Sequence, residues 1–207
     1  MKKQIIDISY NSKENTDYLG LEKRLSNLYP YEFKMDGIVI ASWEGFIQSL
    51  KTPDRMLKRE LWKLHGYQAW KQGQAIPWWE EQIVYWIETP IERQSKQYTE
   101  LITKSYDSLF ECNADFRKAL EESLPYKLDH KKGKTDKSKT MLTRKEYLWQ
   151  LERLRRELRP TKFFNLMDLL SSYYLIYSKN RIILKCLKYI TLMKWKIFTE
   201  KMNGKCR

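Results

Sequence analysis

The segment SWEGFIQSLK, residues 42–51, contains three polar side chains whose spacing suits chemistry. In a helix, at about 100° per residue, Glu44, Gln48 and Lys51 share one stripe beside an apolar face. A carboxylate, an amide and an amine at the edge of a buried zone can act as acid, base or nucleophile, because burial shifts pKa values. The same spacing also fits a solvent-exposed stripe of helix-spaced ion pairs, worth about 0.3–0.5 kcal/mol. The pattern alone leaves both interpretations open.

The elements just before this helix are expected to position it. Residues 31–33 and 38–40 are short runs of β-forming residues, and the intervening Asp36-Gly37 pair is a hairpin signal. Asp36 is therefore expected to serve its turn. Ser42 then fits an N-cap with an acidic residue in the first helical turn, and the helix is expected to end near Lys51.

The rest of the chain predicts a mixture of helices and short strands. The expected elements are a strand at 4–10, a loop at 11–18, a helix at 53–64 stopped by Gly66, a strand at 83–87 turned by Thr89-Pro90, helices at 95–110 and 115–122, a strand at 126–129, a polar loop at 131–139, and a helix from a capping box at 143–146 to about 158. This pattern indicates an α+β fold, dominated by helices, with a small sheet.

Composition limits the class of protein. The 207 residues fit one domain or one domain with an appendage, and a hydrophobic content of 42% excludes wholesale disorder. Three cysteines cannot complete a disulfide framework, so a reducing compartment and a cytoplasmic location are expected. Two histidines and no CxxC pair provide no zinc ligand set. The start MKKQIIDISY lacks the apolar stretch of a secretory signal, so none is expected.

Positive charge is concentrated near the end of the chain. Residues 161–207 contain ten basic and two acidic residues, so they carry +8 of the net +13 and the first 160 residues carry +5. The expected organisation is therefore a domain at 1–160 and a basic amphipathic helical extension at 161–207. No run of 18 residues in the extension lacks a charge, so a transmembrane span is not expected. Three interpretations remain open: helices packed on the body or in a homodimer, a membrane-surface helix, and a weakly selected extension.

Further motifs surround the helix at residues 42–51 in a fixed order. They are LSNLYP at 25–30, Phe33, the Asp36-Gly37 pair, and AWKQG at 69–73. This order resembles the NADAR (YbiA-like) N-glycosidase family. Residues 113–120 and 126–143 are similar to the family's later motifs, and the resemblance covers about residues 24–158.

Two positions depart from that family's pattern. The family histidine that follows the motif glutamate is Gly45 here, and the family's D..WG element is represented by DHKKG at residues 129–133. The second sequence is similar to a histidine-containing branch of the family, with a lysine in place of one serine.

The resemblance implies cleavage of a ribosyl C–N bond, either in a phosphoribosylamino-pyrimidine intermediate of riboflavin synthesis or in an ADP-ribosylated base. Such cleavage passes through an oxocarbenium-like transition state, which a carboxylate near the ribose stabilises, and Glu44 is the candidate. Two roles are open for Lys51: attack on C1 of the ribose to form a Schiff base, or contact with a phosphate. Gln48 would orient the ribose hydroxyls. No metal ion or tightly bound cofactor is implied.

The resemblance also assigns further residues, most of them outside this helix. His130 is a candidate general acid for the leaving nitrogen, or else a strand-end histidine bonded to backbone, and Asp129 is a second candidate carboxylate. The candidate substrate-binding residues are Ser26, Asn27, Tyr29, Trp43, Gln48, Trp70 and Lys71. Alternatives for them are turn capping by the residues of the LSNLYP motif, core packing by the tryptophans, and a solvated helix face for the lysine.

These observations predict a cytoplasmic N-glycosyl hydrolase acting on a small ribosyl phosphate, on an ADP-ribosyl compound or on ADP-ribosylated nucleic acid. Two alternatives belong to other classes. One is a non-catalytic module that binds NAD or ADP-ribose, favoured by Gly45 in place of the family histidine. The other is a nucleic-acid-associated protein that acts through its basic tail.

Overall fold

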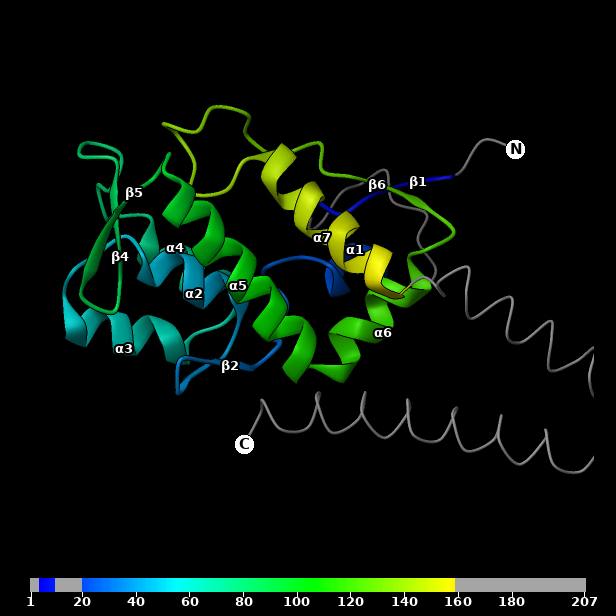
Figure 1. The fold of residues 1–207 in the computed structure, drawn as a ribbon, viewed down its shortest axis with the longest axis horizontal. Coiled ribbons are helices and arrows are strands. Elements are labelled where there is room, and N and C mark those ends of the chain that lie inside the picture. Colours follow the sequence, from blue (N-terminus) through cyan, green and yellow to red (C-terminus); the bar gives the residue numbers. More distant parts are fainter. Residues whose placement is uncertain (1–3, 10–19, 159–207) are drawn as a thin grey trace, which may run out of the picture. The chain divides into compact units, whose positions relative to one another are not determined.

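The computed structural model describes residues 4–9 and 20–158, and Figure 1 shows how their elements are arranged. The helices are α1 (Leu21–Arg24), α2 (Trp43–Ser49), α3 (Arg55–Lys63), α4 (Gly66–Gly73), α5 (Lys96–Cys112), α6 (Ala114–Glu122) and α7 (Arg144–Leu158). The strands are β1 (Ile5–Asp7), β2 (Phe33–Met35), β3 (Ile38–Ile40), β4 (Ile83–Trp86), β5 (Thr89–Glu92) and β6 (Lys127–Asp129). The predicted helix-dominated α+β fold is confirmed, whereas the extension predicted at 161–207 lies outside the described residues.

The strands form pairs instead of the single small sheet that the sequence predicts. In the described ranges there are three two-stranded sheets: β2 with β3, β4 with β5, and β1 with β6. The first two are antiparallel hairpins, and the third is parallel, with Asp7 opposite Asp129. The backbone N–H of Ile8 continues this pairing by donating to the Asp129 carbonyl at 2.8 Å. Residues 5–9 therefore lie beside the segment that carries Asp129 and His130.

The two hairpins turn at different kinds of residue. The Asp36-Gly37 turn is confirmed, with φ of 50° and 82°, because a tight two-residue turn of this kind needs positive φ at both positions. The turn predicted at Thr89-Pro90 is wrong, since those residues belong to β5 and the chain turns at Ile87-Glu88. Ile87 itself has a φ of 53°, so no glycine marks this turn in the sequence.

Gly66 begins a helix instead of ending one. α3 ends at Lys63, and Gly66 is the first residue of α4 with a φ of 57°, a conformation that favours glycine. A Cβ at this position would also lie 2.8 Å from the carbonyl oxygen of Leu28. The glycine therefore starts α4 where another residue would be strained and crowded. α4 carries Trp70, Lys71 and Gly73 and packs against α2.

α5 crosses the middle of the molecule in Figure 1, with α2 and α4 on one side and α7 on the other. Its buried residues include Tyr98, Ser105 and Tyr106. α7 begins with the predicted capping box: the Glu146 N–H donates to Thr143 Oγ1 at 3.2 Å, and the Thr143 N–H donates to Glu146 Oε2 at 2.8 Å. Both long helices, α5 and α7, thus have a buried face toward the core. Among the described residues, no helix is long and apolar enough to cross a bilayer.

Candidate functional site

Helix α2 carries Glu44 and Gln48 of the predicted stripe and is buried along its whole length, while Lys51 follows its C-cap Leu50. Ser42 caps it as expected, because its Oγ accepts the Gly45 N–H at 3.0 Å and donates to the Leu64 carbonyl at 3.1 Å. Gly45 lies against the end of α3, where an added Cβ would be 2.6 Å from the carbonyl oxygens of Leu61 and Leu64. The absence of a side chain at position 45 therefore allows α2 and α3 to pack closely.

Glu44 is a buried acid at the start of α2. Glu44 is only 8% exposed, and its Oε1 accepts a hydrogen bond from Gln48 Nε2 at 2.6 Å. Burial raises the pKa of Glu44 above its ordinary value, although the Gln48 hydrogen bond and the positive charge of Lys51 act in the opposite direction. The burial excludes the alternative of a solvent-exposed stripe.

Lys51 is the buried amine of the same stripe. The residue is 8% exposed, and Nζ donates to the Gly73 carbonyl of α4 at 2.9 Å. Burial lowers the pKa of Lys51 to about 8; the Glu44 carboxylate acts to raise it, and the positive charge of Lys134 acts to lower it further. Burial thus moves the pKa values of the acid and the amine toward each other, which makes a proton easier to pass between them.

Gln48 completes the stripe and has an unused acceptor. The residue is 5% exposed, its amide nitrogen is bonded to Glu44, and its Oε1 has no hydrogen-bond partner within the described ranges. The amide lies against Gly73, where an added Cβ would be 1.9 Å from Oε1. A buried acceptor of this kind is costly unless a donor reaches it, so it is suited to a hydroxyl group of a ligand.

Replacing Gly73 by alanine is expected to lower the free energy of unfolding by about 1–3 kcal/mol, because the new methyl group must displace a buried side chain. Urea denaturation measures this loss, and the side-chain amide signals of Gln48 in NMR spectra should shift. Gln68→Ala, at an exposed position of the same helix, is the matched control and should leave both measurements unchanged. A stable Gly73→Ala variant with an unaltered Gln48 signal would contradict the close packing.

Two tyrosines that the sequence analysis did not single out lie beside Glu44. The Tyr106 hydroxyl donates to Asn27 Oδ1 at 2.9 Å, and the Tyr147 hydroxyl donates to the carbonyl of Leu25. The Asn27 carbonyl accepts the Glu44 N–H at 3.1 Å. Burial raises the pKa of both tyrosines, and the negative charge of Glu44 adds to the effect. These hydroxyls therefore stay protonated.

His130 approaches Tyr147 from the segment that follows β6, and Asp129 lies next to it in the chain. His130 Nδ1 lies 3.0 Å from Ser9 Oγ, and its ring meets the Tyr147 ring edge-on with centroids 5.3 Å apart. Burial is the main cause of the lowered pKa of His130. Asp129 Oδ1 accepts from the His130 N–H at 2.7 Å and from the guanidinium of Arg144. His130 thus lies next to the tyrosine pair, while the Asp129 carboxylate is already engaged.

The predicted binding residues divide into a core set and an exposed set. Trp43 is 2% exposed, stacks on Tyr106 with centroids 4.5 Å apart and donates to Ser105 Oγ at 3.0 Å, so it packs in the core. Trp70, 40% exposed, stacks on Tyr67, and its neighbour Lys71 is exposed. These two α4 residues keep free surface for a ligand.

The residues of the LSNLYP motif mainly build local structure. Ser26 Oγ accepts the Leu28 N–H at 3.2 Å, in the turn-capping role that was the alternative interpretation. Tyr29 packs on Tyr31 with ring centroids 4.5 Å apart. Asn27 differs, because its side chain holds Tyr106 and its carbonyl holds the first turn of α2. In the described part of the chain, no cluster of three or more His, Cys, Asp or Glu side chains could hold a metal ion.

Comparison with known proteins finds a matching protein family and one similar phage protein. A family model described as "Bacteriophage protein GP30.3" matches residues 21–156. The "Uncharacterized 17.1 kDa protein in Gp30-rIII intergenic region" of Enterobacteria phage T4 is 33% identical over 134 residues, which are 63% of this chain and 88% of that protein.

A comparison with solved structures returns the E. coli protein YbiA, determined by NMR, with a TM-score of 0.49 and 18% identity over 76% of this chain and 86% of that one. The family model and the phage T4 relative decide the assignment, and the chain belongs to the bacteriophage protein GP30.3 family.

Proposed function

We propose that this protein is a hydrolase that cleaves the bond between C1 of a ribosyl group and the nitrogen of a base or an amino-pyrimidine. The observation that carries the proposal is the buried stripe of Glu44, Gln48 and Lys51, in which an acid with a raised pKa and an amine with a lowered pKa act on each other electrostatically. Opposite pKa shifts in a neighbouring acid and amine are typical of catalytic groups. The sequence resemblance to NADAR proteins supports the ribosyl substrate.

Glu44 has two tasks in this proposal. As the C1–N bond breaks, its carboxylate stabilises the positive charge that grows on the ribose ring. It then takes a proton from the water that adds to C1, while the leaving nitrogen receives a proton. His130 lies beside Tyr147, and its lowered pKa favours the neutral form. To act as the general acid it would first have to bind a proton.

Lys51 has two roles consistent with its position. As a free amine it attacks C1 of the ring-opened sugar, and the leaving base is lost as a Schiff base forms that water later hydrolyses. As an ammonium it binds a phosphate of the substrate. With a pKa of about 8, about one tenth of the molecules carry the free amine at pH 7, so neither role is excluded by its charge.

Lys51→Met is expected to lower the cleavage rate about 10- to 100-fold, and the pH profile of the wild-type protein separates the two roles. If the free amine attacks, the rate rises as the pH increases through about 8; if the ammonium binds phosphate, the rate falls over that range. Stopped assays from pH 6 to 10, read by mass spectrometry, measure both effects.

Lys58 provides the matched control for that variant. It is also a buried lysine with a pKa lowered by burial to about 8, and its Nζ donates to a backbone carbonyl, that of Tyr85. It belongs to α3 and its pKa shift involves no other charged group. Lys58→Met should therefore keep the wild-type rate and pH profile, and an equal loss in both variants would remove the specific role of Lys51.

The test of the proposed function is incubation with three compounds: a phosphoribosylamino-pyrimidine, an ADP-ribosylated guanine nucleotide and NAD. Products separated by liquid chromatography and identified by mass should show a free ribosyl product from at least one of them, and release from none would overturn the proposal. The second candidate is a non-catalytic binder, favoured by Gly45 in place of the family histidine. Calorimetric binding of ADP-ribose without any product release would support it.

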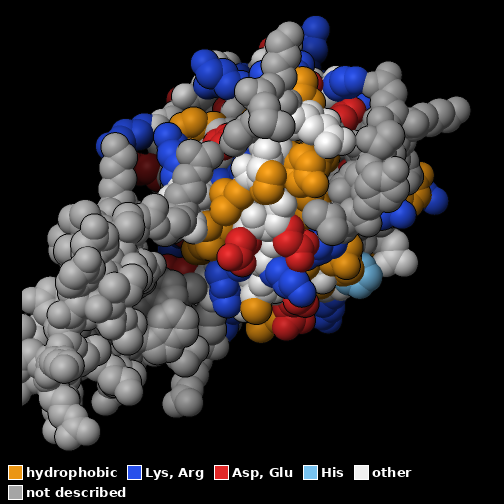
Figure 2. Space-filling view, turned by 90° about the vertical axis from the view of Figure 1, so that its right-hand side faces the viewer, with side chains coloured by type: hydrophobic (Ala, Val, Ile, Leu, Met, Phe, Trp, Pro, Cys, Tyr) orange, Lys and Arg blue, Asp and Glu red, His pale blue; other side chains and the backbone are white. Residues whose placement is uncertain are grey.

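The nucleic-acid proposal depends on residues 161–207, which lie outside the described residues. On the face seen in Figure 2, acidic and basic side chains of the described part are interspersed around apolar ones. Three statements stay predictions: that the substrate is an ADP-ribosylated nucleic acid, that the tail forms a homodimer, and that the protein is cytoplasmic.

A further inference from the structure

A pocket outside the proposed active site opens between α5, α7 and the loop before α7. It has a volume of about 280 Å³ and is lined by Tyr98, Thr99, Ile102, Lys137, Thr143, Lys145, Glu146, Trp149 and Gln150. None of the three residues of the buried stripe is among them. The volume is close to the lower end of the range for small-molecule sites, about 300–1,000 Å³.

The floor and the wall of the pocket are apolar or already satisfied. Tyr98 and Ile102 are buried, and the Tyr98 hydroxyl donates to the carbonyl of Met141. Gln150, 2% exposed, is bonded through its amide nitrogen to Thr103 Oγ1 at 3.0 Å and through its oxygen to Arg153. Trp149 is 47% exposed at the rim. A flat apolar ring can therefore cover the floor beside the indole without leaving these polar groups unpaired.

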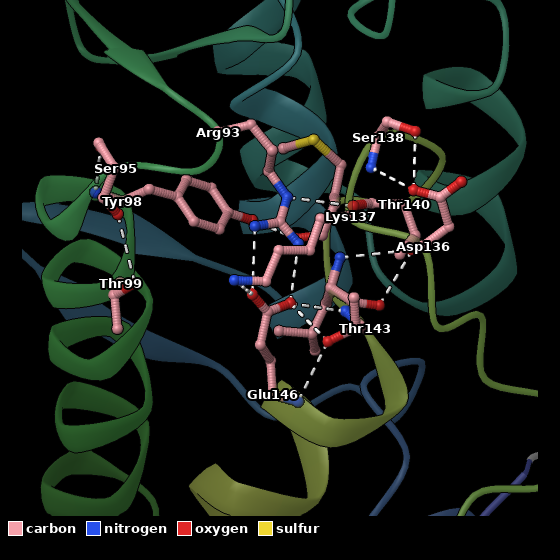
Figure 3. Close-up of polar contacts among 12 residues, drawn as sticks. Arg93, Ser95, Tyr98, Thr99, Asp136, Lys137, Ser138, Thr140, Thr143 and Glu146 are labelled. Atoms are coloured by element: carbon pink, nitrogen blue, oxygen red, sulfur yellow. Dashed lines mark hydrogen bonds and ion pairs between the residues drawn. The ribbon is translucent and has the colours of Figure 1, made fainter.

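The one carboxylate in the pocket is committed to other groups. Glu146 accepts from both terminal nitrogens of Arg93, at 3.2 and 2.7 Å, and from the N–H and hydroxyl of Thr143. Figure 3 shows this network, in which the Lys137 side chain also extends toward the Glu146 carboxylate, with Nζ 3.8 Å from Oε1. Although burial acts to raise it, the hydrogen bond from Arg93 holds the pKa of Glu146 below its ordinary value. The carboxylate is thus poorly placed to attract a cationic ligand.

Positive charge remains for a ligand after this pairing. Lys137 and Lys145 line the rim, and Arg93, 1% exposed, lies behind Glu146 with its guanidinium over the Tyr98 ring, 4.4 Å from the centroid. Arg93 alone balances the charge of Glu146, so the charges of Lys137, whose Nζ lies 3.8 Å from Glu146 Oε1, and of Lys145 favour an anion at the mouth of an otherwise apolar pocket. We propose that this pocket binds a small aromatic anion, with its ring against Trp149 and Ile102 and its negative group between Lys137 and Lys145.

The test uses 2-naphthoate and its uncharged counterpart of the same shape, 2-naphthamide, titrated into the full-length protein by calorimetry. For a ligand of this size we expect a dissociation constant of about 1 mM for the naphthoate. The naphthamide should bind at least about tenfold more weakly because it lacks the charge that the lysines attract. Absence of saturable naphthoate binding, or equal binding of the two compounds, would overturn the proposal.

Two variants locate the site. Trp149→Ala and the double variant Lys137→Gln/Lys145→Gln should each weaken naphthoate binding at least about fivefold. Trp79→Ala, which removes a tryptophan of equal exposure (47%) elsewhere on the surface, and Lys96→Gln/Lys118→Gln are the matched controls and should bind like the wild type. Unchanged binding in both pocket variants would place the ligand elsewhere. Glu44→Gln should leave naphthoate binding intact, which separates this proposal from the proposed hydrolase activity.

Discussion

Glu44→Gln is expected to lower the rate of ribosyl–nitrogen cleavage by about 10³-fold, the largest loss of activity among the variants considered. Glutamine keeps the size of the side chain and can still meet Gln48, which is bonded to Glu44 at 2.6 Å in the wild-type protein. It cannot carry the negative charge that stabilises the ribose cation or accept a proton from water. Single-turnover rates measured by mass at saturating substrate isolate the chemical step from binding.

The same substitution is expected to keep or raise the stability of the folded protein. Because burial raises the pKa of Glu44 in the folded state, its ionisation opposes folding at neutral pH, and this opposition disappears as the pH falls below the ordinary value of 4.5. Glutamine removes the titrating group, so the free energy of unfolding at pH 7 should not decrease. Urea denaturation at pH 7 measures it.

Glu60→Gln is the matched control for Glu44→Gln. Glu60 is exposed on α3 and accepts a hydrogen bond from Gln72 at 3.2 Å, so the change removes a carboxylate without touching the buried stripe. Its rate and stability should stay at the wild-type level. A Glu44→Gln variant with full activity would remove the hydrolase proposal, whereas one that loses both activity and stability would indicate that the charge holds the fold together.

Loss of activity without loss of stability would identify the stripe as a strained functional site. A buried acid and a buried amine both cost free energy, because each leaves water. In this protein the cost is only partly offset, since Lys51 is bonded to the Gly73 carbonyl rather than directly to Glu44 and Gln48 Oε1 has no partner among the described residues. A ligand that brings hydroxyl and phosphate groups would supply the missing interactions.

The sequence predicts the central helix well because its signals are local. Ser42 as the cap and Glu44 in the first turn depend on residues close together in the chain, and the structure has them as predicted. The helix predicted to end near Lys51 ends at Ser49, so Lys51 follows the C-cap Leu50. The capping box of Thr143 and Glu146 is local in the same way. What the stripe pattern could not decide was burial, because that depends on α3 and α4 packing against the helix.

The surroundings of the stripe come from distant segments and could not be predicted. Tyr106 belongs to α5 and Tyr147 to α7, where their helical spacing is that of ordinary core residues. Ser9 reaches His130, 121 residues later in the chain, only because β1 pairs with β6. The prediction that Gly66 ends a helix is wrong, because a glycine with positive φ occurs far more often just after a helix end than at a helix start.

Gly45→His, which restores the family histidine of the NADAR pattern, is expected to destabilise the protein by about 3 kcal/mol or more. An added Cβ would lie 2.6 Å from the backbone carbonyl oxygens of Leu61 and Leu64, closer than van der Waals contact allows. Backbone atoms cannot rotate away as a side chain can, so α2 must move relative to α3, and overpacking of this kind costs about 1–3 kcal/mol even for smaller groups. Urea denaturation measures the loss.

Two further variants test whether the Cβ itself causes that loss. Gly45→Ala should destabilise by about 1–2 kcal/mol, because the clash outweighs the gain of about 1 kcal/mol that alanine brings to a helix. Lys118→His places a histidine at an exposed position of α6 and should change little. If Gly45→His is as stable as the wild type, α2 and α3 are not in close contact. If it is unstable as expected, position 45 has no room for the imidazole, and in the proposed hydrolase Glu44, Lys51 and His130 are the candidates for proton transfer.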